Sequence, residues 1–177
     1  SMRNLYTALF IFLACANISY GREAGNEDKF DIPYELLISN RREECREIVE
    51  KHTIARILRD VEFEIDEPVL IFMMDHPLFL SATLRAMEIK DYLITPDKDG
   101  MYLFDDRKGL RGKFEVIYSE PGQRYYYGEG GYHGLILRLR GRGALLLEYR
   151  MGLSNPPIVY MNANLYTKIE NIVLRIL

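Results

Sequence analysis

The chain has 177 residues, and its 23 basic and 26 acidic side chains leave a formal net charge of −3. This balance argues against nucleic-acid binding through bulk electrostatics, and the length suits one domain with a hydrophobic core. Beyond the leader segment described next, Cys45 is the single cysteine, so we expect no internal disulfide.

Residues 1–21 are interpreted as a tag remnant followed by a secretion signal. Arg3 precedes an apolar stretch that is too short to span a bilayer, and small residues at 14–16 and 19–21 fit cleavage sites. We therefore expect an exported protein, periplasmic or secreted. The alternatives are a buried N-terminal helix, and acylation of Cys15, which would anchor the domain to a membrane.

Residues 22–40 are expected to form an N-terminal leader, followed by a charged helix over 41–60. In that helix Cys45, Ile48 and Val49 follow the three- and four-residue spacing of an amphipathic helix, with a break allowed at 52–53.

Residues 61–65 alternate apolar and acidic side chains, which predicts a half-buried strand. Pro68 then favours a short apolar helix over 69–75. Pro77 stops or redirects that helix, and a second helix is predicted over 78–88.

From residue 89 the apolar period is two, which is typical of strands. The predicted strands, separated by turn residues, cover 92–95, 101–104, 111–118, 124–127, 133–139, 144–151 and 158–163. The glycine-rich segment 128–131 is interpreted as a bend and 140–143 as a connection. Over 167–177 the apolar residues have helical spacing, which predicts a C-terminal helix lying across the sheet.

The segments FEIDEPVLIFMMDHPLFLSATLRAMEI (63–89) and PPIVYMNANLYTKIENIVLRIL (156–177) together resemble the START-like superfamily, also called SRPBCC or polyketide cyclase-like. The resemblance covers residues 61–177 and rests on element order, not on an invariant motif. It implies an α+β helix-grip fold, in which a curved antiparallel β-sheet wraps a C-terminal helix and two short helices follow the first strand. It also implies a cavity between the sheet and that helix.

Members of this superfamily typically bind lipids, sterols or other apolar molecules, and some are cyclases. The resemblance therefore implies an extracytoplasmic binding or carrier protein for a hydrophobic small molecule or lipid, with possible membrane association. A cyclase- or hydrolase-type enzyme and an envelope interaction module without a ligand are the alternatives.

The candidates for lining that cavity are apolar or tyrosine side chains on the faces predicted to point inward. They are Phe72, Met73, Leu84, Met87, Phe114, Val116, Tyr118, Tyr125, Tyr127, Leu135, Leu137, Leu147, Tyr149, Ile169, Ile172, Val173 and Ile176. Any one of them could simply fill the core. The tyrosine hydroxyls in 125–127 could orient the polar end of a ligand, or these residues could be ordinary strand tyrosines.

Few residues suggest chemistry. His133 or Glu148 would be an acid/base candidate if it pointed inward. With three histidines and no metal-ligand spacing, no metal and no cofactor is expected. The basic residues Arg138, Arg140, Arg142 and Arg150 form either a solvated outer face or a contact with anionic lipid headgroups.

Overall fold

The computed structural model describes residues 31–135 and 137–174. Its elements, in chain order, are η1 (Tyr34–Leu36), α2 (Arg42–Glu50), β1 (Ile54–Glu64), α3 (Glu67–Asp75), α4 (Pro77–Ala86), β2 (Leu93–Pro96), β3 (Tyr102–Asp105), β4 (Leu110–Glu120), β5 (Gln123–His133), β6 (Leu137–Met151) and β7 (Ile158–Leu174).

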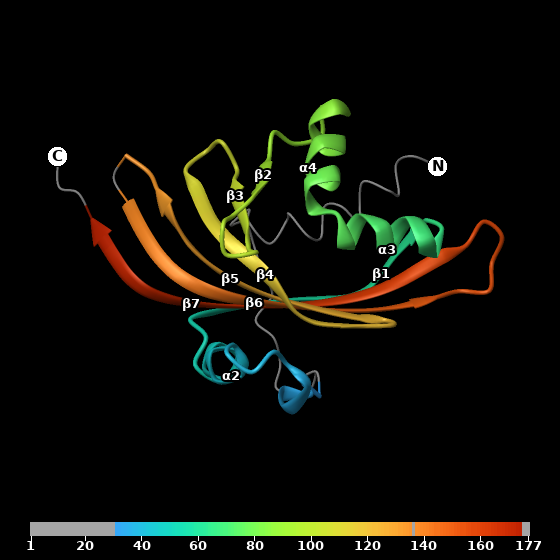
Figure 1. The fold of residues 1–177 in the computed structure, drawn as a ribbon, viewed down its shortest axis with the longest axis horizontal. Coiled ribbons are helices and arrows are strands. Elements are labelled where there is room, and N and C mark those ends of the chain that lie inside the picture. The colour runs from blue at the N-terminus through green and yellow to red at the C-terminus, as the bar shows by residue number, and fades with distance from the viewer. Residues whose placement is uncertain (1–30, 136, 175–177) are drawn as a thin grey trace.

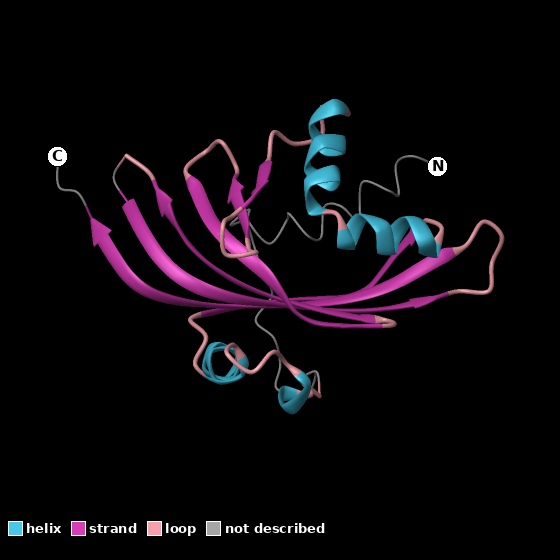
Figure 2. Ribbon diagram, in the orientation of Figure 1, coloured by secondary structure: helices cyan, strands magenta, loops and turns pink. Residues whose placement is uncertain are grey.

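The strands form one seven-stranded antiparallel sheet in the order β1-β7-β6-β5-β4-β3-β2. After β1 the chain crosses through α3 and α4 to the opposite edge, and it then meanders back strand by strand until β7 pairs with β1. The sheet is strongly curved (Figure 1). Helices α3 and α4 lie over its concave face, and η1 with α2 lies beneath its convex face (Figures 1 and 2).

The sheet therefore carries a separate core on each face. The concave core joins α3 and α4 to alternate residues of β5, β6 and β7, including Tyr126, Leu147 and Met161. The convex core joins α2 to the intervening residues, including Tyr125 and Leu146. Because successive side chains of a strand point to opposite faces, one sheet can supply both cores.

The helix pair follows the predicted order closely. Pro68 and Pro77 each occupy the first turn of a helix, where a missing backbone N–H costs nothing, and His76 separates the two helices. Together the pair satisfies the length and composition criteria for a membrane span but is bent by 104°, and no single helix in the described ranges satisfies them.

The predicted C-terminal helix is wrong, and with it the helix-grip fold class. The described part of 167–177 continues β7, which runs to Leu174. A bulge in β7 explains the error, because Gly141 pairs with Ile169 while Arg140 pairs with Asn171. The extra residue places Ile169 and Ile172 on one face at a spacing of three, which imitates a helical stripe.

The helix predicted over 41–60 ends at Glu50, and β1 begins at Ile54. The cause is again a bulge, between Leu58 and Val61, with Asp60 at φ 51°. Leu58 and Val61 pair with Ala163 and Met161 and so share the concave face at helical spacing.

Two glycine-rich segments, predicted as a bend at 128–131 and a connection at 140–143, lie inside β5 and β6. A Cβ atom on Gly130 would lie 2.4 Å from the carbonyl oxygen of Arg111, and one on Gly141 would lie 2.5 Å from that of Lys168. These contacts are far closer than real Cβ atoms allow, so the glycines permit close strand approach where the sheet is curved.

Candidate functional site

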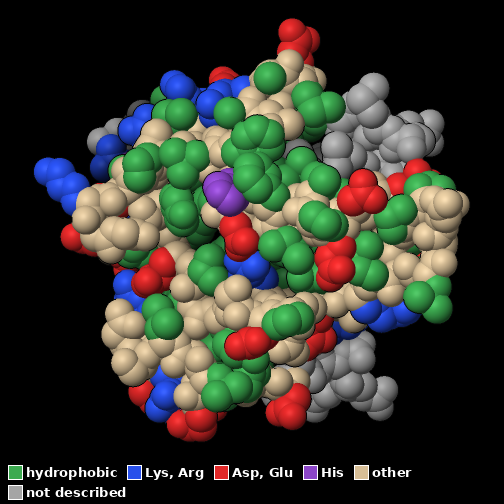
Figure 3. Space-filling model, turned by 45° about the vertical axis from the view of Figure 1, so that its right-hand side comes forward, with side chains coloured by type: hydrophobic (Ala, Val, Ile, Leu, Met, Phe, Trp, Pro, Cys, Tyr) green, Lys and Arg blue, Asp and Glu red, His purple; other side chains and the backbone are tan. Residues whose placement is uncertain are grey.

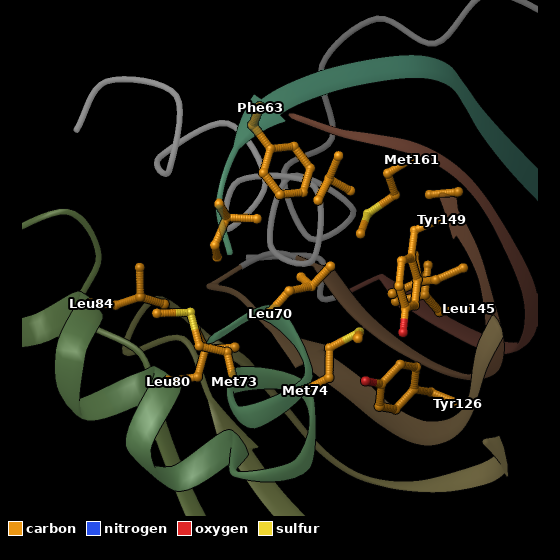
Figure 4. Close-up of a cluster of buried hydrophobic side chains, with 14 of the residues drawn as sticks. Phe63, Leu70, Met73, Met74, Leu80, Leu84, Tyr126, Leu145, Tyr149 and Met161 are labelled. Carbon is orange, nitrogen blue, oxygen red and sulfur yellow. The ribbon is translucent and has the colours of Figure 1, made fainter. Parts of the chain in front are cut away.

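The concave core contains the best candidate for a ligand site. Its buried wall is rich in methionine: Met73 and Met74 come from α3, Met161 comes from β7, and Met151 packs against them from β6. Methionine side chains are flexible and polarizable and can adapt to apolar molecules of different shape. In Figure 4 the labelled side chains of the helix pair and of the sheet point toward one another across this core.

A charged residue is buried against this apolar wall. Arg124 of β5 pairs with Leu147 of the concave core, and only 7% of the residue is exposed. Its guanidinium forms an ion pair with Asp75, the last residue of α3. The side chain of Asp75 is 43% exposed, so the pair runs from the interior to the surface at the end of α3.

The Nε atom of Arg124 is buried and has no hydrogen-bond partner among the described residues. A buried donor without an acceptor costs about 1–3 kcal/mol. An acceptor atom on a bound molecule would remove that penalty. Arg124 is therefore the polar group at which a ligand could be oriented.

Two tyrosines add hydroxyl groups to the same region. Tyr126 and Tyr149 are both buried in the concave core, and Figure 4 shows their hydroxyl ends turned toward the region beside Met74. Burial raises the pKa of Tyr126, and the positive charge of Arg124 partly opposes that rise. The phenol is therefore neutral at ordinary pH and able to donate a hydrogen bond.

The predicted lining residues divide between the faces and the ends of the sheet. Those in or packed against the concave core are Met73, Leu84, Phe114, Val116, Leu147 and Tyr149. Those in or packed against the convex core are Tyr118, Tyr125 and Tyr127. Met87 is the C-cap of α4, and Phe72 is an exposed residue of α3.

The remaining predicted residues lie toward one end of the sheet. Leu137, Ile169, Ile172 and Val173 belong to β6 and β7, and Leu135 is an exposed residue of the β5–β6 connection. Ile176 lies outside the described residues. The predicted row Phe114, Val116 and Tyr118 is broken by a bulge at Ile117, which turns Tyr118 to pair with Tyr125 on the convex face.

Tyr125 and Tyr127 pack in the core on the convex side of the sheet. The ring of Tyr127 lies under the guanidinium of Arg41, 4.2 Å from its centre, and the hydroxyl of Tyr127 donates to Glu129 at 3.4 Å. The hydroxyl of Tyr125 is buried with no partner in the described parts of the chain.

The two acid/base candidates lie on the convex face. Glu148 is half-buried and accepts a hydrogen bond from the amide of Gln123, at 3.1 Å. His133 is exposed near one end of the sheet. Neither of them points into the methionine-lined wall. No group of three potential metal ligands occurs within residues 31–135 and 137–174.

Sequence reasoning did not select Arg124 or Asp75. The available signal was the strand alternation, which placed the middle tyrosine, Tyr126, opposite its two neighbours. Since Arg124 is two residues from Tyr126, it shares that face.

The outer surface of the helix pair is also apolar. Val69, Phe72, Leu78 and Phe79 are each more than a third exposed. The ring of Phe72 stacks on His76 at 4.1 Å and meets Phe79 edge-on at 5.2 Å. Figure 3 shows hydrophobic side chains gathered over the upper part of the molecule.

No family model matches the chain, and no curated protein or solved structure matches it either.

Proposed function

We propose that this protein binds a lipid or another apolar small molecule against the concave face of its sheet, with the polar end of the ligand at Arg124. The observation that carries the proposal is a buried arginine with an unsatisfied Nε atom beside a methionine-rich apolar wall. Binding sites for small molecules commonly combine a mostly apolar lining with a few placed polar groups.

The proposed ligand is an amphiphile with one acidic or strongly hydrogen-bonding end. A carboxylate or similar acceptor would accept a hydrogen bond from the Nε–H of Arg124, and the hydroxyls of Tyr126 and Tyr149 lie on the same face. The apolar remainder would contact Met73, Met74 and their neighbours.

We also propose that the protein acts outside the cytoplasm, free or anchored through Cys15. This part rests on the sequence of residues 1–21, which lie outside the described residues. An exported protein of this kind would handle envelope lipids or imported apolar molecules.

The test begins with native mass spectrometry of the full purified chain, which we expect to reveal co-purifying lipid. After delipidation, binding of the fluorescent probe N-phenylnaphthylamine and its displacement by oleate are measured. Met73→Gln, which places an amide in the concave wall, is expected to weaken probe binding about tenfold, because an apolar ligand offers that amide no hydrogen-bond partner.

The matched control is Met101→Gln. Met73 and Met101 are both nearly buried, 9% and 5% exposed, but Met101 belongs to the convex core. Both variants lose stability, so probe affinity is compared only below the unfolding transition of each. A chain that carries no lipid and takes up neither probe, or equal effects of the two variants, would overturn the proposal.

A further inference from the structure

An open hollow of about 350 Å³ lies at the end of the sheet where β5, β6 and β7 meet. It is distinct from the concave core. Its lining includes His133, Arg138, Arg140, Asn171 and Val173.

Strand register explains why these side chains converge. Arg138 and Arg140 are alternate residues of β6, so both point to the convex face, as Arg142 does. His133 lies directly opposite Arg138 on β5, and Asn171 lies opposite Arg140 on β7.

Gly131 also lines the hollow. It lies opposite Arg140 on β5, and a Cβ atom there would lie 2.4 Å from the carbonyl oxygen of Leu139. No side chain is tolerated at this position without a backbone shift. The space beside Arg140 therefore stays open to a bound group.

The positive charge in the hollow is not balanced within the described structure. Arg142, the next residue on this face, binds Glu47 at 3.0 Å and Glu170 at 2.5 Å. Arg138 and Arg140 are exposed and make no ion pair with any residue in 31–135 or 137–174. The chain as a whole carries a net charge of −3, so this pair of guanidiniums forms a locally positive site on a negatively charged protein.

We propose that this hollow binds a phosphate group, carried by a phospholipid headgroup or by a soluble phosphate compound. Paired arginine forks suit the geometry of phosphate oxygens, and Asn171 and His133 add hydrogen-bonding groups at the sides. Val173, 48% exposed, gives the hollow an apolar edge. The site is independent of the ligand proposed for the concave face.

The experiment uses the full chain and two kinds of probe. Sedimentation with phosphatidylcholine vesicles, with and without phosphatidylglycerol, tests a headgroup at a lipid surface. Isothermal titration with inorganic phosphate and glycerol phosphate tests a soluble ligand. The variant is Arg138→Gln combined with Arg140→Gln, both on exposed positions where folding should be unaffected.

Arg150→Gln is the matched control, because Arg150 is an exposed arginine on the same face of the same strand. Its guanidinium lies 4.2 Å from the ring centre of Tyr160, away from the hollow. We expect the double variant to lose at least tenfold in affinity for one probe class, and Arg150→Gln to lose less than twofold. Circular dichroism confirms the fold of each variant.

Loss confined to phosphatidylglycerol vesicles identifies a lipid surface as the source of the phosphate, and loss of titrated phosphate identifies a soluble ligand. Both results support the site. The proposal is overturned if the unaltered chain binds neither class of probe. It is also overturned if the double variant and the unaltered chain bind with equal affinity.

Discussion

The two faces of the sheet are covered in different ways. On the convex face, α2 brings Cys45 and Ile48 onto Leu146 and Tyr125, and all four residues are 0% exposed. On the concave face the core residues range from 0% exposure at Val159 to 9% at Met73, and Arg124 is buried with them. The buried residues of the convex core are no more than 5% exposed, while the concave core combines several methionines with a buried charge.

The ion pairs reinforce the same distinction. Helix α2 is fixed to the sheet by Glu47, which binds Arg142 and Lys168, and just before its first residue Arg41 binds Glu115 of β4 at 2.5 Å. Helix α3 is joined to the sheet by the pair of Asp75 and Arg124. Helix α2 and the residue before it are thus held to the sheet at Glu47 and Arg41, and the ligand site that we propose lies on the opposite face, where Asp75 and Arg124 join α3 to the sheet.

The largest effect is expected in the convex core. Leu146→Ala removes a fully buried side chain and should destabilise the protein by about 3 kcal/mol, through lost burial and the cavity left behind. Urea denaturation measures the change. A loss below about 1 kcal/mol would mean that this core is not the tightly packed layer described above.

A smaller loss of stability is expected when the ion pair of Asp75 and Arg124 is broken, and its size should depend on which partner is replaced. Asp75→Asn leaves the buried guanidinium of Arg124 without its counter-charge and should cost about 2 kcal/mol. Arg124→Gln leaves Asp75 partly solvated and should cost less, while weakening ligand binding more. The reverse order of the two stabilities in urea denaturation would contradict the burial of the pair.

The pH dependence of stability should report on the convex core. Burial raises the pKa of the Cys45 thiol from 9.0 to about 11. Since the folded-state pKa lies above that of the unfolded chain, this contribution is complete below pH 9 and is lost as the pH rises toward 11. At pH 10 it should have fallen by about 1 kcal/mol.

Urea denaturation at pH 8 and pH 10 checks this expectation, with Cys45→Ala as the control. The variant should lose less stability between the two pH values than the unaltered chain. Equal losses would show that the thiol does not titrate as its burial requires.

The smallest effect is expected at the surface ion pairs of α2. Hydrogen bonds from Lys168 and Arg142 lower the pKa of Glu47, so its carboxylate is charged at neutral pH. Glu47→Gln should reduce stability slightly at low salt and not at all in 1 M salt, because exposed charges are screened. A salt-independent loss in thermal unfolding would instead indicate a packing defect.

The sequence predicted much of the fold, and its failures come from β-bulges and from glycines placed inside strands. The helix pair, the turns between β2 and β3 and between β4 and β5, and the alternation within β6 followed from turn residues, proline placement and apolar period. The sequence predicts helix over 54–60 and 167–174, where the structure has strand, because bulges at Asp60 and Glu170 set apolar residues three apart on one face. The bulge at Ile117 broke an alternation that was otherwise correct. A bulge depends on cross-strand pairing, which a single sequence does not display.

The candidate site was predicted only in part. Met73, Leu147 and Tyr149 followed from hydrophobic periodicity, and the structure places them in one core. Arg124 was not selected, because its significance depends on burial and on contact with Asp75, 49 residues away in the chain. Charged residues on strands are usually solvated, and nothing in the local sequence distinguishes this one.

The most direct test of ligand binding on the concave face uses methionine methyl groups as NMR reporters on both faces of the sheet. The chain has seven methionines. Met73, Met74, Met151 and Met161 lie in or against the concave core, and Met101 lies in the convex core. With the methyl groups labelled with carbon-13, oleate is titrated and the NMR spectrum recorded. We predict that the resonances of Met73, Met74, Met151 and Met161 shift and that the resonance of Met101 does not. Unchanged concave resonances, or an equal shift of Met101, would contradict it.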